Sequence, residues 1–206
     1  MNLRLSLVTI LFCGWMLWSP PAFSADFVTK GDIRKSSVEM FKSFFTKEKC
    51  DQILIDTFTI CYDHERKSPT AVYVEVTGPT VVEDIDKRPP FFTDKRVEKD
   101  YRTTSKDYTN TGYDRGHFGA SDASHDWDKK HQKATYSMAN IVPQTPFANR
   151  YKFIALEKHE REMAVKYGRL ENVTIAFWNN RPKRIGKSQL QVPSAFAKLY
   201  TDGKGY

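Results

Sequence analysis

The segment Asp114-Arg115-Gly116-His117 places an acid, a cation and an imidazole around a glycine. A neutral imidazole, whose unperturbed pKa lies near ~6.5, accepts a proton at neutral pH and can act as a general base. The glycine lets the backbone approach another group closely. A single histidine is more often structural or exposed than catalytic, and this is our interpretation of His64, His125, His131 and His159. Only its neighbours make His117 a candidate base.

A second polar segment follows, and its local signals predict an α-helix over about residues 146–167. Thr145 can cap the start of this helix, and Pro146 suits its first position. Gly168 is the next glycine or proline along the chain, and it suits the residue after a helix end. The sequence therefore predicts one long helix with a defined start and a defined end.

Four residues of this helix recur at a spacing of four, so each is displaced by only about 40° from the previous one. They are Asn149, Phe153, Glu157 and Arg161. One stripe of the helix would then carry an amide, a carboxylate and a guanidinium. On spacing alone, the simpler interpretation is an exposed surface with an ordinary ion pair between Glu157 and Arg161.

Together these motifs resemble the DNA/RNA non-specific endonuclease family. The resemblance is clearest over residues 88–161. The four residues that end at His117 would carry little weight alone, and the order and spacing of several motifs make the resemblance specific. These motifs are Asp114-Arg-Gly-His117, Asn140-Ile-Val-Pro-Gln144, Asn149, Leu156-Glu157 and Arg161.

The resemblance implies a ββα-metal nuclease fold and gives each matching residue a role. His117 would be the general base, Asn149 the direct protein ligand of Mg²⁺, and Glu157 would hold metal-bound waters. Mn²⁺ or another divalent cation could replace Mg²⁺. Arg88, in Lys87-Arg88-Pro89-Pro90, resembles the family arginine that contacts the phosphate. Further positions that would support the site or bind substrate are Asp114, Arg115, Asn140, Gln144 and Arg161.

The activity implied by the resemblance is hydrolysis of phosphodiester bonds in DNA and RNA with little sequence preference. Such a reaction needs a deprotonated water, neutralised charge on the phosphate and a stabilised leaving 3′-oxygen. Mg²⁺ prefers oxygen ligands and keeps several waters, so a neutral amide leaves its charge available for the phosphate. Arg88 would add a planar pair of donors to phosphate oxygens. Further cations could follow the nucleic-acid backbone without reading bases, although each alone fits an exposed loop: Lys87, Lys95, Arg96, Lys99, Arg102 and Lys106.

The rest of the sequence predicts one α+β domain with a largely antiparallel sheet and the long active-site helix. No repeat or long linker divides it. Residues 83–112 are polar, charged and contain proline, which predicts a long surface excursion of the kind that is usually functional. The other predicted elements are a short amphipathic helix at 36–49, a hairpin of strands at 53–62 and 71–77, and strands at 173–178 and 196–200.

Residues 1–25 have the layout of a secretory signal peptide. Arg4 precedes an apolar run from Leu5 to Trp18 that is too short to span a bilayer comfortably, and residues 22–25 offer small side chains for cleavage. The predicted mature chain, residues 26–206, would be a single nuclease domain that is secreted or periplasmic. Its net charge is +6 instead of the +7 of the full chain, because the leader holds one cation and no acid. A positive charge favours an anionic partner such as nucleic acid, although many basic proteins bind none.

Removal of the leader leaves two cysteines, Cys50 and Cys61. Export to an oxidising compartment favours a disulfide between them. If residues 51–60 form one extended strand, however, the two cysteines lie about 35 Å apart, far beyond bonding reach. A bond requires the chain to turn near Asp56-Thr57, so both outcomes remain open.

Two other classes of protein fit part of the sequence. An exported nucleic-acid-binding protein without enzymatic activity would explain the positive charge, but it has no need of His117, Asn149 and Glu157 together. A zinc protein built on His125 and His131 matches no strong spacing pattern and lacks a cysteine cluster. The metal-dependent endonuclease is therefore the function that the residues favour.

Overall fold

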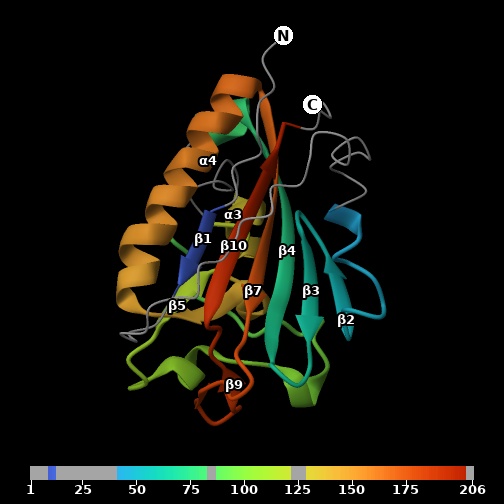
Figure 1. Cartoon of the computed structure of the whole chain (residues 1–206), viewed down its shortest axis with the longest axis vertical. Helices are drawn as coiled ribbons and strands as arrows, with labels where there is room; N and C mark the ends of the chain where they lie inside the picture. Colours follow the sequence, from blue (N-terminus) through green and yellow to red (C-terminus); the bar gives the residue numbers. More distant parts are fainter. Residues whose placement is uncertain (1–8, 13–40, 83–86, 122–128, 203–206) are drawn as a thin grey trace, which may run out of the picture.

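A six-stranded antiparallel sheet forms the centre of the part of the chain that the structure describes (Figure 1). The computed structural model describes residues 9–12, 41–82, 87–121 and 129–202. The strand order is β1-β10-β7-β4-β3-β2, and neighbouring strands are antiparallel. The predicted α+β architecture with a largely antiparallel sheet is confirmed. The strands are β1 (Thr9–Phe12), β2 (Gln52–Ile55), β3 (Thr59–Asp63), β4 (Ser68–Thr77), β7 (Arg169–Phe177) and β10 (Ala195–Thr201).

The central strand β4 is buried on both faces of the sheet. Val72, Val74 and Val76 have no exposed surface and belong to the core between the sheet and the long helix. Ala71 points to the opposite face, into a separate core that includes Phe41. Branched side chains at every second position suit a pleated strand, whose residues alternate between faces. The sheet therefore separates two apolar layers.

The long helix lies along one side of the sheet (Figure 1). Its backbone is helical from residue 146, passes through the π-helical segment η6 (Ala148–Phe153), and continues as α4 (Ile154–Tyr167). The Thr145 hydroxyl accepts a hydrogen bond from the Ala148 nitrogen at 3.2 Å. Gly168 ends the helix with a left-handed φ of 82°, which costs a glycine no steric strain. The predicted helix over 146–167 is confirmed at both ends, whereas the π turn was not predicted.

A smaller layer packs on the same face of the sheet as α4. Its centre is an antiparallel ribbon of β5 (Asp114–His117) and β6 (Ile141–Gln144). Val142 of β6 belongs to the main core, and a Cβ at Gly119 would lie only 2.3 Å from the side chain of Val72. The ribbon therefore rests directly on β4. Smaller elements nearby are α3 (Lys129–Thr135), η5 (Met138–Asn140), β8 (Arg184–Ile185) and β9 (Leu190–Gln191).

The excursion predicted at 83–112 is irregular over its described part, which begins at residue 87. The buried Asp94 carboxylate anchors it, accepting hydrogen bonds from Arg96 at 2.7 Å and from the Ser137 hydroxyl at 2.5 Å. Burial alone would raise the pKa of Asp94, but the bonds from Arg96 and Ser137 outweigh burial and leave it below its ordinary value. Short 3₁₀ segments in and before the excursion are η2 (Gly78–Val82), η3 (Lys99–Tyr101) and η4 (Ser105–Tyr108).

The segment 53–62 is not one strand. β2 ends at Ile55, the chain turns over residues 56–58, and β3 returns beside β2 with Leu54 opposite Ile60. The prediction of a single strand was wrong because β-forming residues run on either side of a turn that contains neither glycine nor proline. β3 and β4 then form a second hairpin.

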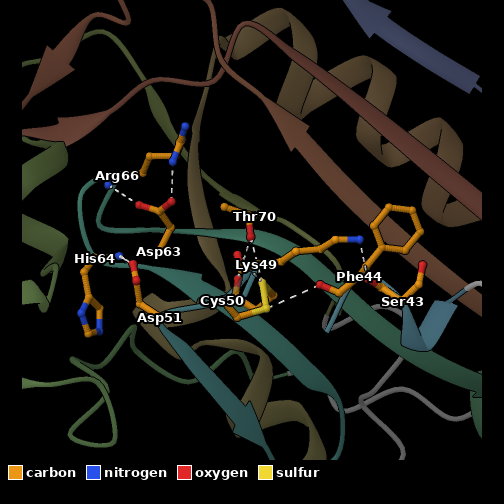
Figure 2. The surroundings of a disulfide bond; sticks show 10 residues. Ser43, Phe44, Lys49, Cys50, Asp51, Asp63, His64, Arg66 and Thr70 are labelled. Carbon is orange, nitrogen blue, oxygen red and sulfur yellow. Dashed lines mark hydrogen bonds and ion pairs between the residues drawn. A yellow bond between two sulfur atoms is a disulfide. The ribbon is translucent and has the colours of Figure 1, made fainter. Parts of the chain in front are cut away.

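The turn brings Cys50 and Cys61 to a Cα–Cα distance of 5.1 Å, and the two form a disulfide (Figure 2). Figure 2 also shows Lys49 beside the bond, where its ammonium group donates to the Ser43 carbonyl at 2.7 Å. The disulfide fastens the segment 41–50 over the face of the sheet that α4 does not cover. The condition that the sequence set for this bond, a turn near residues 56–57, is met.

The helix predicted at 36–49 is not formed as a whole. Residues 36–40 lie outside the described residues, and within the described part only residues 41 and 42 are helical. Turns follow through residue 49, so the prediction was wrong for that part. The apolar side chains that suggested a helix, Phe41, Phe44 and Phe45, instead pack on the sheet around the disulfide.

Strand β1 lies within the predicted signal peptide. Its residues pair with 195–198 of β10 at the edge of the sheet. The rest of residues 1–25 lies outside the described residues, so the signal peptide stays a prediction. Within the described ranges, no helix has the length and apolar character needed to cross a membrane.

Replacement of both cysteines, Cys50→Ala with Cys61→Ala, is expected to lower the free energy of unfolding by about 2–3 kcal/mol. The disulfide restricts the unfolded chain by closing a loop with a sequence separation of 11. Urea denaturation of residues 26–206, followed by tryptophan fluorescence, measures the change. Reductant should shift the midpoint of the wild type and leave the double variant unchanged. Identical wild-type midpoints with and without reductant would contradict the bond.

Candidate functional site

His117 is the last residue of β5, where the ribbon pairs it with Ile141 of β6. Gln144 folds over Gly116, and its amide nitrogen donates to the carbonyl oxygen of His117 at 3.3 Å. A Cβ at Gly116 would lie 2.2 Å from Cδ of Gln144, so no larger residue fits there without a shift. The glycine of the motif is therefore explained by the close approach of a buried amide.

Aromatic rings flank the imidazole of His117. Tyr136 meets it edge to face with ring centroids 4.9 Å apart, and Phe91 lies at 5.7 Å in a tilted orientation. The guanidinium of Arg115 lies 4.9 Å from the centroid of the Phe91 ring. Edge and face contacts of this kind favour particular ring orientations. The half-buried imidazole is thus held in a defined orientation.

Arg88 lies on the segment that supplies Phe91 to the surroundings of His117. The next residue, Phe92, is fixed beside the ribbon, because its carbonyl oxygen accepts a hydrogen bond from the Met138 nitrogen at 2.9 Å. Arg88 itself is exposed. The predicted phosphate-binding arginine and the predicted base therefore belong to neighbouring segments of the fold.

The carboxylate of Asp114 joins β5 to the start of the long helix. Arg150 binds it through two nitrogens, at 2.8 and 2.9 Å, and the Asn149 amide nitrogen donates to it at 3.1 Å. The hydrogen bond from Arg150 is the main reason that the pKa of Asp114 lies below its ordinary value, although partial burial opposes it. Because the nitrogen of the Asn149 amide faces Asp114, its carbonyl oxygen is turned away from the carboxylate.

The π turn changes which residues share a face of the helix. In an uninterrupted α-helix, the eight steps from Asn149 to Glu157 leave the two side chains about 80° apart. Asn149 lies inside the π-helical segment η6, whose wider turns advance by only about 80° per residue, so the difference between Asn149 and Glu157 falls to roughly 20° or less. Phe153 is only 2% exposed and packs edge-on against Phe196. Asn149, Phe153 and Glu157 therefore stay close to one face of the helix, and the buried Phe153 shows that this face borders the core.

Asn140 and Gln144 are fully buried and support the ribbon from within. The Asn140 amide nitrogen donates to the carbonyl oxygens of Ala120 at 2.7 Å and Thr135 at 2.9 Å. These bonds fix the loop that follows His117. Both amides thus lie behind the strand, where they can position His117 but are covered from a substrate.

The other residues singled out in the sequence differ in their exposure. Glu157 and Arg161 are half-buried on α4. Arg115 is exposed, and its guanidinium group donates to the Ser105 hydroxyl. Its contact with the Phe91 ring and this hydrogen bond place the Arg115 side chain against the irregular excursion, close to His117.

Some neighbours of the site were missed by the sequence interpretation. Arg150 follows Asn149 directly. The positive end of the helix dipole disfavours a cation there, so an arginine at this position suggests an acidic partner, which is Asp114. The rings beside His117 have no comparable signal, because nothing in the sequence distinguishes Phe91 or Tyr136 from other aromatic residues. Only the folded chain brings them together.

The possible metal ligands of the site are few. Within the described ranges, no group of three or more His, Cys, Asp or Glu side chains could hold a metal ion. Of the alternative zinc ligands, His131 lies on α3 and His125 lies outside the described residues. The amide oxygen of Asn149 is a hard donor, which suits a cation that keeps most of its water.

A short antiparallel ribbon carries a histidine, and Asp114 of the same strand accepts a hydrogen bond from an asparagine at a helix start, which is the arrangement of a ββα-metal nuclease fold. The sequence profile of the family described as DNA/RNA non-specific endonuclease matches residues 36–205. The chain belongs to this family.

Individual relatives support this membership. The chain is 28% identical over 155 residues to mitochondrial endonuclease G of Homo sapiens, covering 70% of this chain and 52% of that protein. It is 35% identical over 98 residues to a nuclease of Nostoc sp., covering 48% of this chain and 35% of that protein. The solved structure of an EndoG/EndoGI complex matches with a TM-score of 0.65 and 25% identity, over 72% of this chain and 66% of that chain. The chain spans about half the length of the endonuclease G relatives.

The variant Gly116→Ala is expected to lower the free energy of unfolding by roughly 1–3 kcal/mol, because the new methyl group overlaps the buried amide of Gln144. The double variant Gly116→Ala with Gln144→Ala removes that amide and should recover part of the loss. Urea denaturation of the wild type and both variants measures the difference. A single variant as stable as the wild type would contradict the packing of Gln144 on the glycine.

Proposed function

We propose that the protein is an exported, Mg²⁺-dependent endonuclease that hydrolyses phosphodiester bonds of DNA and RNA with little sequence preference. The observation that carries this proposal is the Asp114 junction, in which the strand that bears His117 is bonded to the amide of Asn149. A base and a ligand on two rigid elements, held by charged hydrogen bonds, are what a hydrolytic site requires. Membership of the endonuclease family supports the same reaction.

In this proposal His117 is the general base. Its imidazole accepts the proton of the water that attacks the phosphorus atom. Tyr136 and Phe91 orient the ring, and Gln144 holds the backbone that carries it. Orientation matters because the acceptor nitrogen must come within hydrogen-bond reach of the water.

The residues of the site fit a hydrated Mg²⁺ ion, for which Mn²⁺ or another divalent cation could substitute. Asn149 would bind it through the carbonyl oxygen, since its amide nitrogen is engaged by Asp114. Glu157, on the same face of the helix, would bind waters of the ion. When bound, such an ion acts as a Lewis acid that stabilises the leaving 3′-oxygen and the charge on the phosphate.

Cations around the site would bind the substrate through its phosphates. Arg88 and Arg115 are exposed on the segments that flank His117. Arg161 lies on α4, about one turn after Glu157. Contacts to phosphates position a nucleic acid without reading its sequence, which agrees with low sequence preference. Arg96 is already paired with Asp94 and Asp56. Exposed lysines along the excursion extend this surface: Lys87, Lys95, Lys99 and Lys106.

The leader-like residues 1–25 and the disulfide together support export. We propose that residues 1–25 are removed and that residues 26–206 act as one nuclease domain in the periplasm or the medium. The disulfide between Cys50 and Cys61 supports an oxidising destination, because such bonds persist there and are rare in the cytosol.

Purified residues 26–206 should nick supercoiled plasmid and degrade RNA in the presence of Mg²⁺, and both reactions should stop with chelator. His117→Ala is expected to lower kcat by about 10²–10⁴-fold, because the variant lacks the proposed general base. Plasmid nicking followed on gels measures both effects. Full activity of His117→Ala would contradict its role as the base.

The matched control is His131→Ala on α3, which should keep wild-type activity. Loss of activity in this control, together with restoration by Zn²⁺, would favour the zinc alternative. Retention of plasmid in a gel-shift assay without any cutting by the wild type would instead identify a non-enzymatic binding protein.

Asn149→Ala is expected to raise the Mg²⁺ concentration for half-maximal activity at least tenfold, because the ion loses its direct ligand. The fold should persist, since Arg150 still binds Asp114 in this variant. Titration of activity with Mg²⁺ and the far-UV circular dichroism spectrum test both expectations. Asn179→Ala, an exposed asparagine outside the site, is the control. An unchanged Mg²⁺ titration of Asn149→Ala would rule out the ligand role.

A further inference from the structure

The hairpin of residues 183–192, which contains β8 and β9, carries exposed cations and no acid. Its cations are Lys183, Arg184 and Lys187. Arg184 is paired with Glu65 at 3.6 Å. Lys183 points elsewhere, with its ammonium group 4.9 Å from the centroid of the Tyr113 ring. In the part of the chain that the structure describes, no carboxylate forms an ion pair with Lys183, so its charge is available to an anionic partner.

This hairpin is packed firmly against the elements of the proposed site. Ile185 is 5% exposed and belongs to one apolar cluster with Tyr113 and with Ile141 of β6. The Ser188 nitrogen donates to the buried carboxylate of Asp107 at 2.8 Å, which ties the hairpin to the excursion. Figure 1 shows β9 at the same end of the molecule as β5. Lys183 therefore has a fixed position relative to the strand that bears the proposed base.

Lys183 lies on the same face of that strand as His117. Alternate residues of a strand point to one face, so Tyr113, Arg115 and His117 share a face at the start of and along β5. Their contacts agree, because the Phe91 ring contacts both Arg115 and His117 and lies in one cluster with Tyr113. The proposed base, the Arg115 guanidinium and the Lys183 ammonium thus follow one another along the strand.

The spacing of this row suits a polyphosphate chain. Two residues advance a strand by about 6.6 Å, which is comparable with the separation of successive phosphates on one nucleic-acid strand. A lysine binds phosphate as a point charge, without reading a base. The contact with the Tyr113 ring holds the Lys183 ammonium in place before substrate binds, which lowers the cost of ordering its long side chain.

We propose that Lys183 binds a substrate phosphate beyond the one bound by Arg115, so that the site engages one strand over several consecutive phosphates. This inference rests on the proposed function and names the substrate class of the same site. That class is a polynucleotide backbone, in contrast to a single phosphodiester. The hairpin then adds affinity through charge alone, in agreement with low sequence preference.

The salt dependence of binding tests this contact without cutting. Fluorescence anisotropy of a labelled DNA duplex is measured in chelator for the wild type and for Lys183→Met, which removes the charge and keeps most of the stem over the Tyr113 ring. Each phosphate contact contributes about 0.9 to the slope of log affinity against log salt. Between about 50 and 200 mM salt, the wild type should therefore lose roughly 3.5-fold more affinity than the variant.

Kinetics of duplex cleavage separate a binding role from a structural one. Lys183→Met should raise KM roughly threefold to tenfold and leave kcat unchanged, because a phosphate contact away from the reacting bond stabilises ground state and transition state alike. Lys183→Arg keeps the charge and should restore both KM and the salt slope. The matched control is Lys166→Met, which removes a lysine whose ammonium lies 5.4 Å from the Tyr167 ring at the other end of α4, and it should change neither.

An unchanged salt slope in Lys183→Met, or an equal change in Lys166→Met, would overturn the contact. So would a lower kcat at unchanged KM that Lys183→Arg does not repair, since that pattern marks a structural role of the hairpin. Failure of the wild type to cut any nucleic acid would overturn the proposed function, whereas the salt slopes in chelator would still decide whether Lys183 binds phosphate.

Discussion

The carboxylate of Asp114 fixes the position of the helix start relative to the strand that bears His117. Its partners Asn149 and Arg150 lie 35 and 36 residues further along the chain, so this junction is a long-range contact. The paired bonds to Arg150 are specific in geometry, because a planar guanidinium meets both carboxylate oxygens. The Arg150 side chain is 63% exposed, so solvent screens the attraction and its contribution to stability is small. The junction therefore determines orientation more than stability.

A second anchor holds the middle of the helix on the sheet. The ammonium group of Lys198 lies 2.9 Å from the Glu160 carboxylate, with both side chains only 2% exposed, and Asn172 donates to the same carboxylate at 2.6 Å. A buried pair of this kind adds little stability over apolar packing, but a shifted helix would leave both charges buried and unpaired. The pair therefore selects one register of helix on sheet. The π-helical segment η6 (Ala148–Phe153) includes Asn149 and Arg150 and ends before Glu160, so it lies at and after the first anchor.

The parts of this structure that were predictable are those decided by neighbours in the sequence. Thr145 and Gly168 act on the backbone next to them, so the ends of the helix could be predicted from their residue types. The π turn could not, because it leaves the spacing of residues in the sequence unchanged and no residue type marks it. The turn at residues 56–58 was left open for a related reason. Asp56 suits a turn, but the residues around it favour a strand, and pairing of β2 with β3 decides where the chain reverses.

The candidate site shows the same division. Its motif residues could be grouped from their order and spacing, yet the sequence did not show that Asn140 and Gln144 lie behind the strand. That placement depends on the gap at Gly116 and on the carbonyl groups that Asn140 reaches. Arg150 was missed because its partner lies on a distant strand. Spacing along a chain thus identifies which residues belong to a site, whereas their depth depends on packing between elements.

Different parts of the molecule pack on the two faces of the sheet. The ribbon and the long helix, which hold the proposed base and ligand, pack on one face, and the segment fastened by the Cys50–Cys61 disulfide packs on the other. β4 and β7 lie between these two layers with side chains buried on both faces of the sheet. Both layers therefore pack against the same two close-packed strands. The covalent bond on one face can therefore stabilise the sheet without restricting the side chains of the proposed site on the other.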